Sequence, residues 1–274
     1  MSDYPLSYDR QPIDAGPEDP AQKPLSARQT DEFYNAAQTM ETKRRELTGR
    51  ILLDYGLRSS ELAHSRPSWL IREKHPKTRE ADWCVDVPKG ARCTNGNPDA
   101  GQGNSTGADL HNTSEPCSQC SDRSYSDKDW VDDEFHEKTP WHPKSKKSYQ
   151  YRVWRIPKES ALETIKEWEG FLQPDQQWPV TSSTVLRDVK RIRDRANALS
   201  EDNDDLDGIN RPIHAHALRH TFGCRLAAAG FEPTVRMRQL RHGSYEMALY
   251  YSAAWNLRHR DSVQDSEWKA NEEF

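Results

Sequence analysis

The sequence has few apolar residues and no long apolar run. Only 34% of its 274 residues are hydrophobic, whereas 30% are charged. No stretch approaches the roughly 20 apolar residues that a membrane-spanning helix needs, and residues 1–24 lack the apolar core of a signal peptide. We therefore expect a cytoplasmic protein that does not contact a membrane, with a modest core diluted by polar segments.

An excess of basic residues is also absent, since the formal net charge is −5. This balance excludes a uniformly basic surface, so any surface for nucleic acid must be a local patch. Cysteine is scarce as well. Five cysteines in a chain of this length do not form a disulfide framework, so their positions must be explained in another way.

Composition divides the chain into three parts. Residues 1–28 are rich in proline and show no periodicity, which is typical of a disordered segment or linker. Residues 29–257 carry the periodic apolar patterns of a folded domain, and residues 258–274 form a C-terminal tail. Within the domain, the stretch from about residue 88 to 141 is rich in Gly, Asn, Asp, Ser and Thr. A structureless loop of that length is rare in a compact domain, so we interpret it as a polar insert.

Apolar spacing predicts an α+β domain that is mainly helical and has a small β-sheet. Leu47, Ile51 and Tyr55 recur at helical spacing, and Gly56 follows where a helix C-cap belongs. Short strands are predicted at 69–71, 85–87 and 149–156. Further helical stripes are formed by Leu162, Ile165 and Trp168, by Val185, Val189 and Ile192, and by Leu218, Phe222, Leu226 and Ala229.

A histidine and an arginine share one face of the predicted helix over 214–230. His216 and Arg219 lie away from the apolar stripe of that helix. Polar groups of this kind on a buried helix cost free energy unless an anion lies opposite them. His242 follows Arg219 by 23 residues, and Tyr251 follows His242 by nine. Any two of these residues at such a spacing occur in many proteins. The order and spacing of the whole set are therefore what point to a function.

Four motifs in this order resemble the tyrosine recombinases, a family that includes phage-type integrases of mobile elements and viruses. The motifs are GLRSSEL at residues 56–62, HALRHTF at 216–222, LRHGS at 240–244 and Tyr251. The resemblance covers residues from about 30 to 257 and implies the catalytic-domain fold of that family. It also implies double-stranded DNA as the substrate, a homotetramer on DNA, and a reaction that needs no cofactor.

The resemblance assigns a role to each motif residue. Arg58 and Arg219 clamp the nonbridging phosphate oxygens, and His242 adds a hydrogen bond to the same phosphate. Tyr251 is the nucleophile that forms a 3′-phosphotyrosyl bond. Its unperturbed pKa is about 10, so its proton must be taken up, and His216 is the candidate for that step.

Two choices between neighbouring residues follow from the resemblance. Tyr250 adjoins Tyr251, but a shift of one residue turns a helical side chain by about 100°, and the spacing from His242 favours Tyr251. The family places a lysine on a β-hairpin as the acid that protonates the leaving 5′-oxygen. Lys144 matches that lysine, and Lys146 remains the rival.

Basic side chains form two candidate DNA contacts. Arg187, Lys190 and Arg191 lie on the predicted exposed side of one helix, and Lys146 and Lys147 lie on the hairpin. The alternative is an ordinary solvated surface. Family members usually carry an N-terminal core-binding domain that closes around DNA, so a chain with only 28 residues before its domain is expected to be a fragment or a minimal recombinase.

Four of the five cysteines lie in or beside the polar insert. Cys117 and Cys120 form a Cys-x-x-Cys pair, which with Cys84 and Cys93 predicts a tetrahedral structural zinc site. Cys84 and Cys93 are separated by eight residues, more than in a zinc knuckle. Cys84 facing the core of a strand is therefore the alternative, with His111 as the substitute ligand.

The leading hypothesis is a site-specific DNA recombinase or integrase that cuts and rejoins strands. A type IB topoisomerase-like enzyme that relaxes DNA is the second. The third is a non-catalytic DNA-binding protein on the same scaffold, against which the intact set of Arg58, His216, Arg219, His242 and Tyr251 argues.

Overall fold

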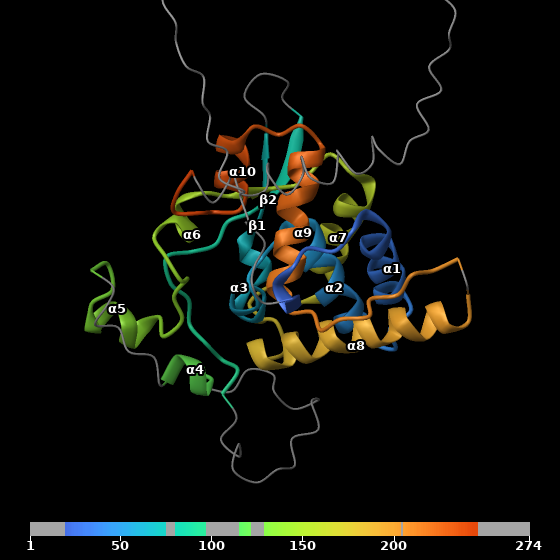
Figure 1. Cartoon of the computed structure of the whole chain (residues 1–274). Coiled ribbons are helices and arrows are strands. Elements are labelled where there is room, and N and C mark those ends of the chain that lie inside the picture. Colours follow the sequence, from blue (N-terminus) through green and yellow to red (C-terminus); the bar gives the residue numbers. More distant parts are fainter. Residues whose placement is uncertain (1–19, 75–79, 97–114, 122–128, 204, 246–274) are drawn as a thin grey trace, which may run out of the picture.

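Helices make up most of the described structure, and a small sheet lies against them (Figure 1). The structure is a computed structural model that describes residues 20–74, 80–96, 115–121, 129–203 and 205–245. Helix α2 (Lys43–Tyr55) is central, because it packs against α1 (Ala27–Gln38), α7 (Glu159–Phe171), α8 (Ser182–Glu201) and α9 (Ala215–Ala228). Within these described ranges, no helix combines the length and the apolar character that crossing a membrane requires.

The packed part of the chain begins before the boundary at residue 29 that composition predicts. A 3-10 helix, η1 (Pro20–Gln22), contacts α9. Leu25 is buried, and its backbone N–H donates to Thr221 Oγ1 at 2.9 Å. Ser26 caps α1 by accepting from the backbone N–H of Gln29. Residues 20–28 thus belong to the domain. The sequence does not predict this, because the segment is short, is fixed by individual contacts and shows no helical or strand periodicity.

The predicted helix that ends at Gly56 is confirmed. Leu47, Ile51 and Tyr55 are buried on α2, and Gly56 follows with φ of 57°. Only glycine adopts this left-handed conformation without strain, and a Cβ here would lie 2.4 Å from the Phe222 ring. The tight turn leads the chain directly into α3 (Ser59–His64).

The sheet has three antiparallel strands in the order β1, β2, β3. In β1 (Leu70–Lys74) and β2 (Ala81–Val85), Leu70 pairs with Val85, and β3 (Val153–Trp154) adds Val153 opposite Val85. The strand predicted at 69–71 is confirmed at Leu70 and Ile71, whereas the strand predicted at 85–87 lies earlier in the chain and ends at Val85. The strand predicted at 149–156 is shorter, because α6 (Lys147–Gln150) occupies its start. The 3-10 helix η2 (Pro67–Trp69) precedes β1.

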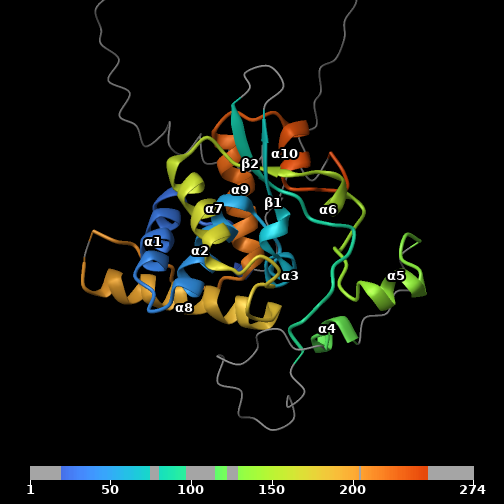
Figure 2. The same ribbon diagram turned by 180° about the vertical axis from the view of Figure 1, so that it is seen from behind.

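The polar insert is described at residues 88–96, 115–121 and 129–141. It contains α4 (Ser118–Ser121) and α5 (Asp133–Lys138), which lie to one side of the helical core in both views (Figures 1 and 2). The backbones of Ala91 and Trp141 exchange hydrogen bonds of 2.9 and 3.1 Å. The insert thus leaves and rejoins the domain at one place.

The C-terminal helices agree with the sequence. The predicted apolar stripe of α8 is buried, and so are Leu218, Phe222 and Leu226 of α9, whereas Ala229, the C-cap of α9, is exposed. Gly230 follows α9 with φ of 78°, and Pro233 begins α10 (Pro233–Gln239). The mainly helical α+β class with a small antiparallel sheet is therefore confirmed.

Candidate active site

One pocket gathers three of the predicted catalytic residues from separate segments. Arg58, Lys144 and His216 line a cavity of about 440 Å³. Lys144 and His216 are exposed there, so a ligand can reach them. The walls therefore suit an anion. The other lining residues are Gln22, Ser59, Ser60, Leu186, His214 and Ala215.

Arg58 is fixed at the start of α3 through both its backbone and its side chain. Its backbone N–H donates to Glu61 Oε2 at 2.8 Å. Its Nη1 donates to Glu61 Oε1 at 2.8 Å and to Ser148 Oγ at 2.9 Å. The side chain is 18% exposed, so one edge of the guanidinium is held while another faces the pocket.

Glu61 joins Arg58 to a second arginine, Arg241. Arg241 Nη2 donates to Glu61 Oε2 at 2.7 Å, and both side chains are fully buried. Burial alone would raise the pKa of Glu61, but the charges of Arg241, Arg58 and Arg219 outweigh it and lower the pKa to about 2. Glu61 is thus ionised at neutral pH and holds two guanidinium groups.

Arg219 ties together the turns that lead to Arg58 and His242. It is 1% exposed, and its Nη1 donates to the Gly56 carbonyl oxygen at 2.6 Å. Its Nη2 donates to the Leu240 carbonyl oxygen. A planar guanidinium suits this double contact. The structure therefore buries Arg219 and His242, and neither is among the residues that line the pocket.

The two predicted site histidines are neutral at neutral pH. Partial burial of the ring and the charges of Arg219, Arg58 and Lys144 lower the pKa of His216 to about 4. Burial and the charges of Arg219 and Arg58 lower the pKa of His242 to about 3. A neutral imidazole has one ring nitrogen that can accept a proton. His216, on the pocket wall, can therefore act as a base.

Acidification from about pH 6.5 to about pH 5 is expected to destabilise the fold through His220 and His242. Burial, His216 and Arg219 lower the pKa of His220 to about 3, so both buried histidines titrate far below the unfolded value of about 6.5. In this range the unfolded chain binds more protons, so the free energy of unfolding falls as pH falls. The slope is up to about 1.4 kcal/mol per pH unit for each histidine. Urea denaturation across this range measures it, and an unchanged slope in His220→Gln would contradict the assignment.

Lys144 and Lys146 lie in different surroundings. Lys144 lines the pocket, and its charge contributes to the lowered pKa of His216. Lys146 Nζ donates to Asp129 Oδ2 at 2.8 Å, a hydrogen bond that raises the pKa of Lys146. Of the two, the structure brings Lys144 to the pocket.

The sequence from Asp129 to Asn256 matches the model of the phage integrase family. The chain carries a phage integrase domain. This family is that of the tyrosine recombinases, as the motifs imply. The matched range includes Lys144, His216 and Tyr251, whereas Arg58 precedes it.

Solved recombinase structures share the fold of this integrase domain. The XerH site-specific recombinase bound to palindromic difH substrate aligns with a TM-score of 0.50 and 16% identity, covering 89% of this chain and 53% of XerH. The Tn1549 transposon integrase in complex with a circular intermediate DNA aligns with a TM-score of 0.52 and 15% identity, covering 91% and 67%. This chain thus spans about half the length of XerH. The comparison confirms the catalytic-domain fold, and the sequence matches none of the curated proteins searched.

The predicted nucleophile and its neighbour lie outside the described residues. Tyr251 and Tyr250 fall in the range 246–274, and both fall within the family match. Their assignment stays a prediction.

The basic residues predicted to contact DNA lie in two places in the chain. Arg187, Lys190 and Arg191 are exposed on α8. Lys147 lies near the Tyr151 ring, with Nζ 5.6 Å from its centroid. Exposure makes the α8 residues available to a partner, and their role in DNA binding stays a prediction.

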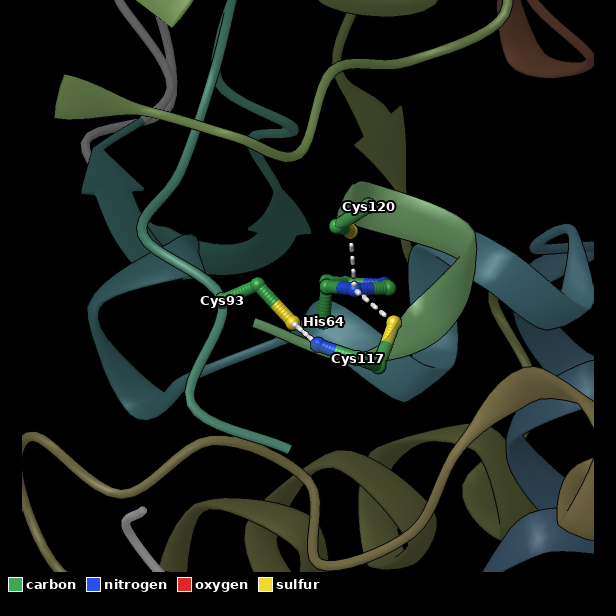
Figure 3. Close-up of side chains that lie close together, drawn as sticks. All are labelled: His64, Cys93, Cys117 and Cys120. Carbon is green, nitrogen blue, oxygen red and sulfur yellow. Dashed lines mark hydrogen bonds between the residues drawn. The ribbon is translucent and has the colours of Figure 1, made fainter. Parts of the chain in front are cut away.

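A second polar cluster contains three of the four cysteines predicted to bind zinc. His64, Cys93, Cys117 and Cys120 are buried, and their potential ligand atoms lie within 4.8 Å of one another (Figure 3). Cys84 as a zinc ligand is wrong. It lies in β2, paired with Ile71 and Trp154 across the sheet, and burial raises its pKa to about 11. The substitute ligand His111 lies outside the described residues.

His64 presents one nitrogen to the sulfur atoms. Its Nδ1 is 2.7 Å from the Ser60 carbonyl oxygen, and this contact fixes Nδ1 as the donor. Nε2 is then free of hydrogen and lies 3.3 Å from Cys120 Sγ and 3.9 Å from Cys117 Sγ. Sequence reasoning missed His64 because it precedes Cys93 by 29 residues and lies on α3, which carries none of the cysteines.

The cysteine segments have the local geometry of a metal-binding turn. The backbone N–H of Cys117 donates to Cys93 Sγ at 3.3 Å, and that of Cys120 donates to the Cys117 carbonyl oxygen at 2.8 Å. Hydrogen bonds from Cys117 and Cys120 lower the pKa of Cys93 and so favour its thiolate. One imidazole and three sulfur atoms suit a soft or borderline divalent ion rather than magnesium or calcium.

Proposed function

We propose that this protein is a site-specific DNA recombinase that cuts and rejoins DNA strands through a 3′-phosphotyrosyl bond to Tyr251. The observation that carries the proposal is the meeting of Arg58, Lys144 and His216 in one pocket, with the buried charge of Arg219 close enough to act on His216. A DNA phosphate supplies the anion that such a pocket suits. The family match and the DNA-bound recombinases of the same fold support DNA as the substrate.

In the proposed reaction, Tyr251 Oη attacks phosphorus and the bond from phosphorus to O5′ breaks. Charge grows on the nonbridging oxygens, where Arg58 donates hydrogen bonds and the buried charge of Arg219 adds to the positive potential. His216 accepts the phenol proton, which its lowered pKa allows at neutral pH. The phosphotyrosyl ester retains the bond energy, so attack by a new 5′-hydroxyl rejoins the strand without ATP or a catalytic metal.

The departing O5′ needs a proton, and we assign its donor as Lys144 because that side chain lines the pocket. Lys144→Ala is expected to slow cleavage by about 100- to 10,000-fold. A substrate whose bridging O5′ is replaced by sulfur needs no acid, since a thiolate is a good leaving group. Single-turnover cleavage of this substrate should restore most of the lost rate. Lys146→Ala is the comparison. Because Lys146 is also a proposed DNA contact, its cleavage is measured at saturating substrate, where the rate should match the wild type. Loss of cleavage in Lys144→Ala without rescue by the sulfur substrate would show that Lys144 is not the acid.

The exposed cations of α8 are proposed to contact the DNA backbone, together with Lys146 and Lys147. Each contact with a phosphate releases counterions, so log K falls with log salt concentration by about 0.9 per contact. An Arg187→Gln/Arg191→Gln variant is expected to bind duplex DNA more weakly and to show a slope shallower by about 2. Fluorescence anisotropy at several salt concentrations measures this slope. The same slope in both proteins would leave α8 an ordinary solvated face.

We propose that the cluster of His64, Cys93, Cys117 and Cys120 holds a zinc ion of structural type. Four protein ligands complete a tetrahedron, which leaves no position for a water or a substrate. The ion therefore takes no part in strand cleavage. Elemental analysis of the purified protein is expected to give one zinc per chain.

A covalent adduct tests the proposed function. The protein is incubated with a nicked suicide substrate that carries a candidate attachment site, so that the short 5′-hydroxyl strand diffuses away after cleavage. We expect an adduct that survives denaturation, and mass spectrometry of its digest should find the nucleotide on the peptide that contains Tyr251. Binding without any adduct would favour the non-catalytic DNA-binding alternative.

A further inference from the structure

We propose that the metal centre positions the catalytic groups, because it holds α3, which begins beside Arg58, and the segment that leads to Lys144. This inference rests on the proposed function for its catalytic readout. The juxtaposition is direct: His64 is the last residue of α3, and Arg58 is the N-cap of the same helix. Metal binding at one end of α3 thus acts on the residue at the other.

The first connection runs through α3 itself. This helix has six residues, too few to be stable without contacts at its ends. Glu61 holds Arg58 at the N-terminal end, and His64 holds the C-terminal end through the cysteine cluster. His64 also contacts the Ser60 carbonyl oxygen, and Ser60 lines the catalytic pocket. A shift of His64 would therefore move a wall of the pocket.

The second connection runs through Trp141. Its ring stacks on His64 with centroids 5.1 Å apart and an angle of 17°, and the side chain is 1% exposed. Its backbone pairs with Ala91, two residues before Cys93. Lys144 follows Trp141 by three residues. Ordering of the metal site thus fixes the start of the segment that presents Lys144 to the pocket.

The third connection joins the segment that contains Cys93 and Asn95, here called the Cys93 arm, to the C-terminal end of α3 and to residues 177–178. Asn95 Nδ2 donates to the Ala63 carbonyl oxygen at 3.2 Å and to the Trp178 carbonyl oxygen at 2.9 Å. Gln177 Nε2 donates to the Ala63 carbonyl oxygen at 2.8 Å. The arm therefore lies against the C-terminal end of α3 in a network of buried amides, which costs free energy to disrupt.

The insert needs the ion to keep this arrangement. Its segments are polar and supply few apolar side chains, so an ion contributes the binding free energy that a core would otherwise supply. Without it, three sulfur atoms and an imidazole remain buried without their common partner. We expect α3 and the segment from Trp141 to Lys144 to loosen, while the apolar interface between α2 and α9 persists.

Three full-length variants test the proposal. Cys120→Ser removes a ligand, Cys120→His restores one of a different type, and Cys84→Ser is the control because Cys84 is a buried cysteine outside the cluster. Zinc content, hydrogen exchange of residues 59–64, and the single-turnover adduct rate at saturating suicide substrate are measured for each. Cys120→Ser should lose zinc, lose protection in α3 and cleave about 10- to 100-fold more slowly. Cys84→Ser should match the wild type, and Cys120→His should recover part of each property.

A double-mutant cycle shows whether the effect reaches catalysis through Arg58. Loss of zinc should slow cleavage less in an Arg58→Ala background than in the wild type, since the positioned group is already absent. A zinc-free protein with full α3 protection and full cleavage rate would overturn the proposal, and so would exchange that rises throughout α2 and α9. Failure of the proposed function is distinguishable, because zinc-loaded wild type would then form no adduct while exchange of α3 still responds to zinc.

Discussion

A Tyr251→Phe variant is expected to form no covalent adduct with the suicide substrate, whereas Tyr250→Phe keeps adduct formation. In the proposed reaction the phenol oxygen bonds to phosphorus, and phenylalanine lacks this oxygen, so no residual rate is expected from this position. Denaturing gel electrophoresis of labelled DNA measures the adduct. Duplex binding by Tyr251→Phe should stay within about twofold of the wild type, because one oxygen is removed and no charge changes.

The paired variants matter because the two tyrosines are adjacent in the chain. The helix that the sequence predicts there would turn their side chains about 100° apart, so we expect only one of them to reach the phosphate proposed to bind at Arg58. Spacing from His242 favours Tyr251. Loss of the adduct in Tyr250→Phe and its retention in Tyr251→Phe would reverse the assignment. Loss in both would show that the second tyrosine is needed for packing.

Local patterns in the sequence were sufficient to predict most of the helical framework. The stripe of α2 and its end at Gly56 follow from spacing within one helix, and both are confirmed. The burial of the α8 stripe, and of Leu218, Phe222 and Leu226 on α9, follows from spacing of the same kind. A helix of this kind buries one face whichever elements pack against it. A window of about a dozen residues is therefore enough to predict the helix and its buried face.

Contacts between distant segments were harder to predict. The insert places Cys93 beside His64, and β2 takes Cys84 away from them into the sheet. No spacing rule links a histidine on one helix to cysteines beyond a hairpin. The meeting of Arg58 with Arg241 through Glu61 has the same origin, because the two arginines are 183 residues apart. The family motifs supplied the candidate residues, and the fold determines which of them share a pocket, namely Arg58, Lys144 and His216.

Glu61→Gln is expected to lower the free energy of unfolding by about 3–5 kcal/mol, because it leaves the buried Arg241 guanidinium without its counter-ion. The lowered pKa of Glu61 leads to a similar magnitude for the loss in the free energy of unfolding. A folded pKa of about 2 against an ordinary value of 4.5 makes the ionised carboxylate worth about 3 kcal/mol above pH 4.5. This stability is lost as pH falls from 4.5 through about 2. Urea denaturation at pH 7 measures the change.

The exposed residue Glu134 supplies the matched control. Its ion pair with Lys138 is 80% exposed on the glutamate side, so Glu134→Gln should change the free energy of unfolding by less than about 1 kcal/mol. An equally small effect of Glu61→Gln would show that Arg241 finds another partner.

Arg241 supplies the decisive second variant, because its φ of 52° is a conformation that glycine adopts without strain. Arg241→Gly therefore removes a buried charge and a backbone strain together. In the Glu61→Gln background it should restore part of the lost stability, with a coupling of about 1–3 kcal/mol between the two sites. It should not restore cleavage, since Arg58 would still lack the carboxylate that orients it. This result would show that Glu61 has two distinct roles. It stabilises the fold by balancing the buried Arg241 charge, and through its other oxygen it holds Arg58 at the pocket for catalysis. Recovery of both by Arg241→Gly would mean that Glu61 serves the fold alone.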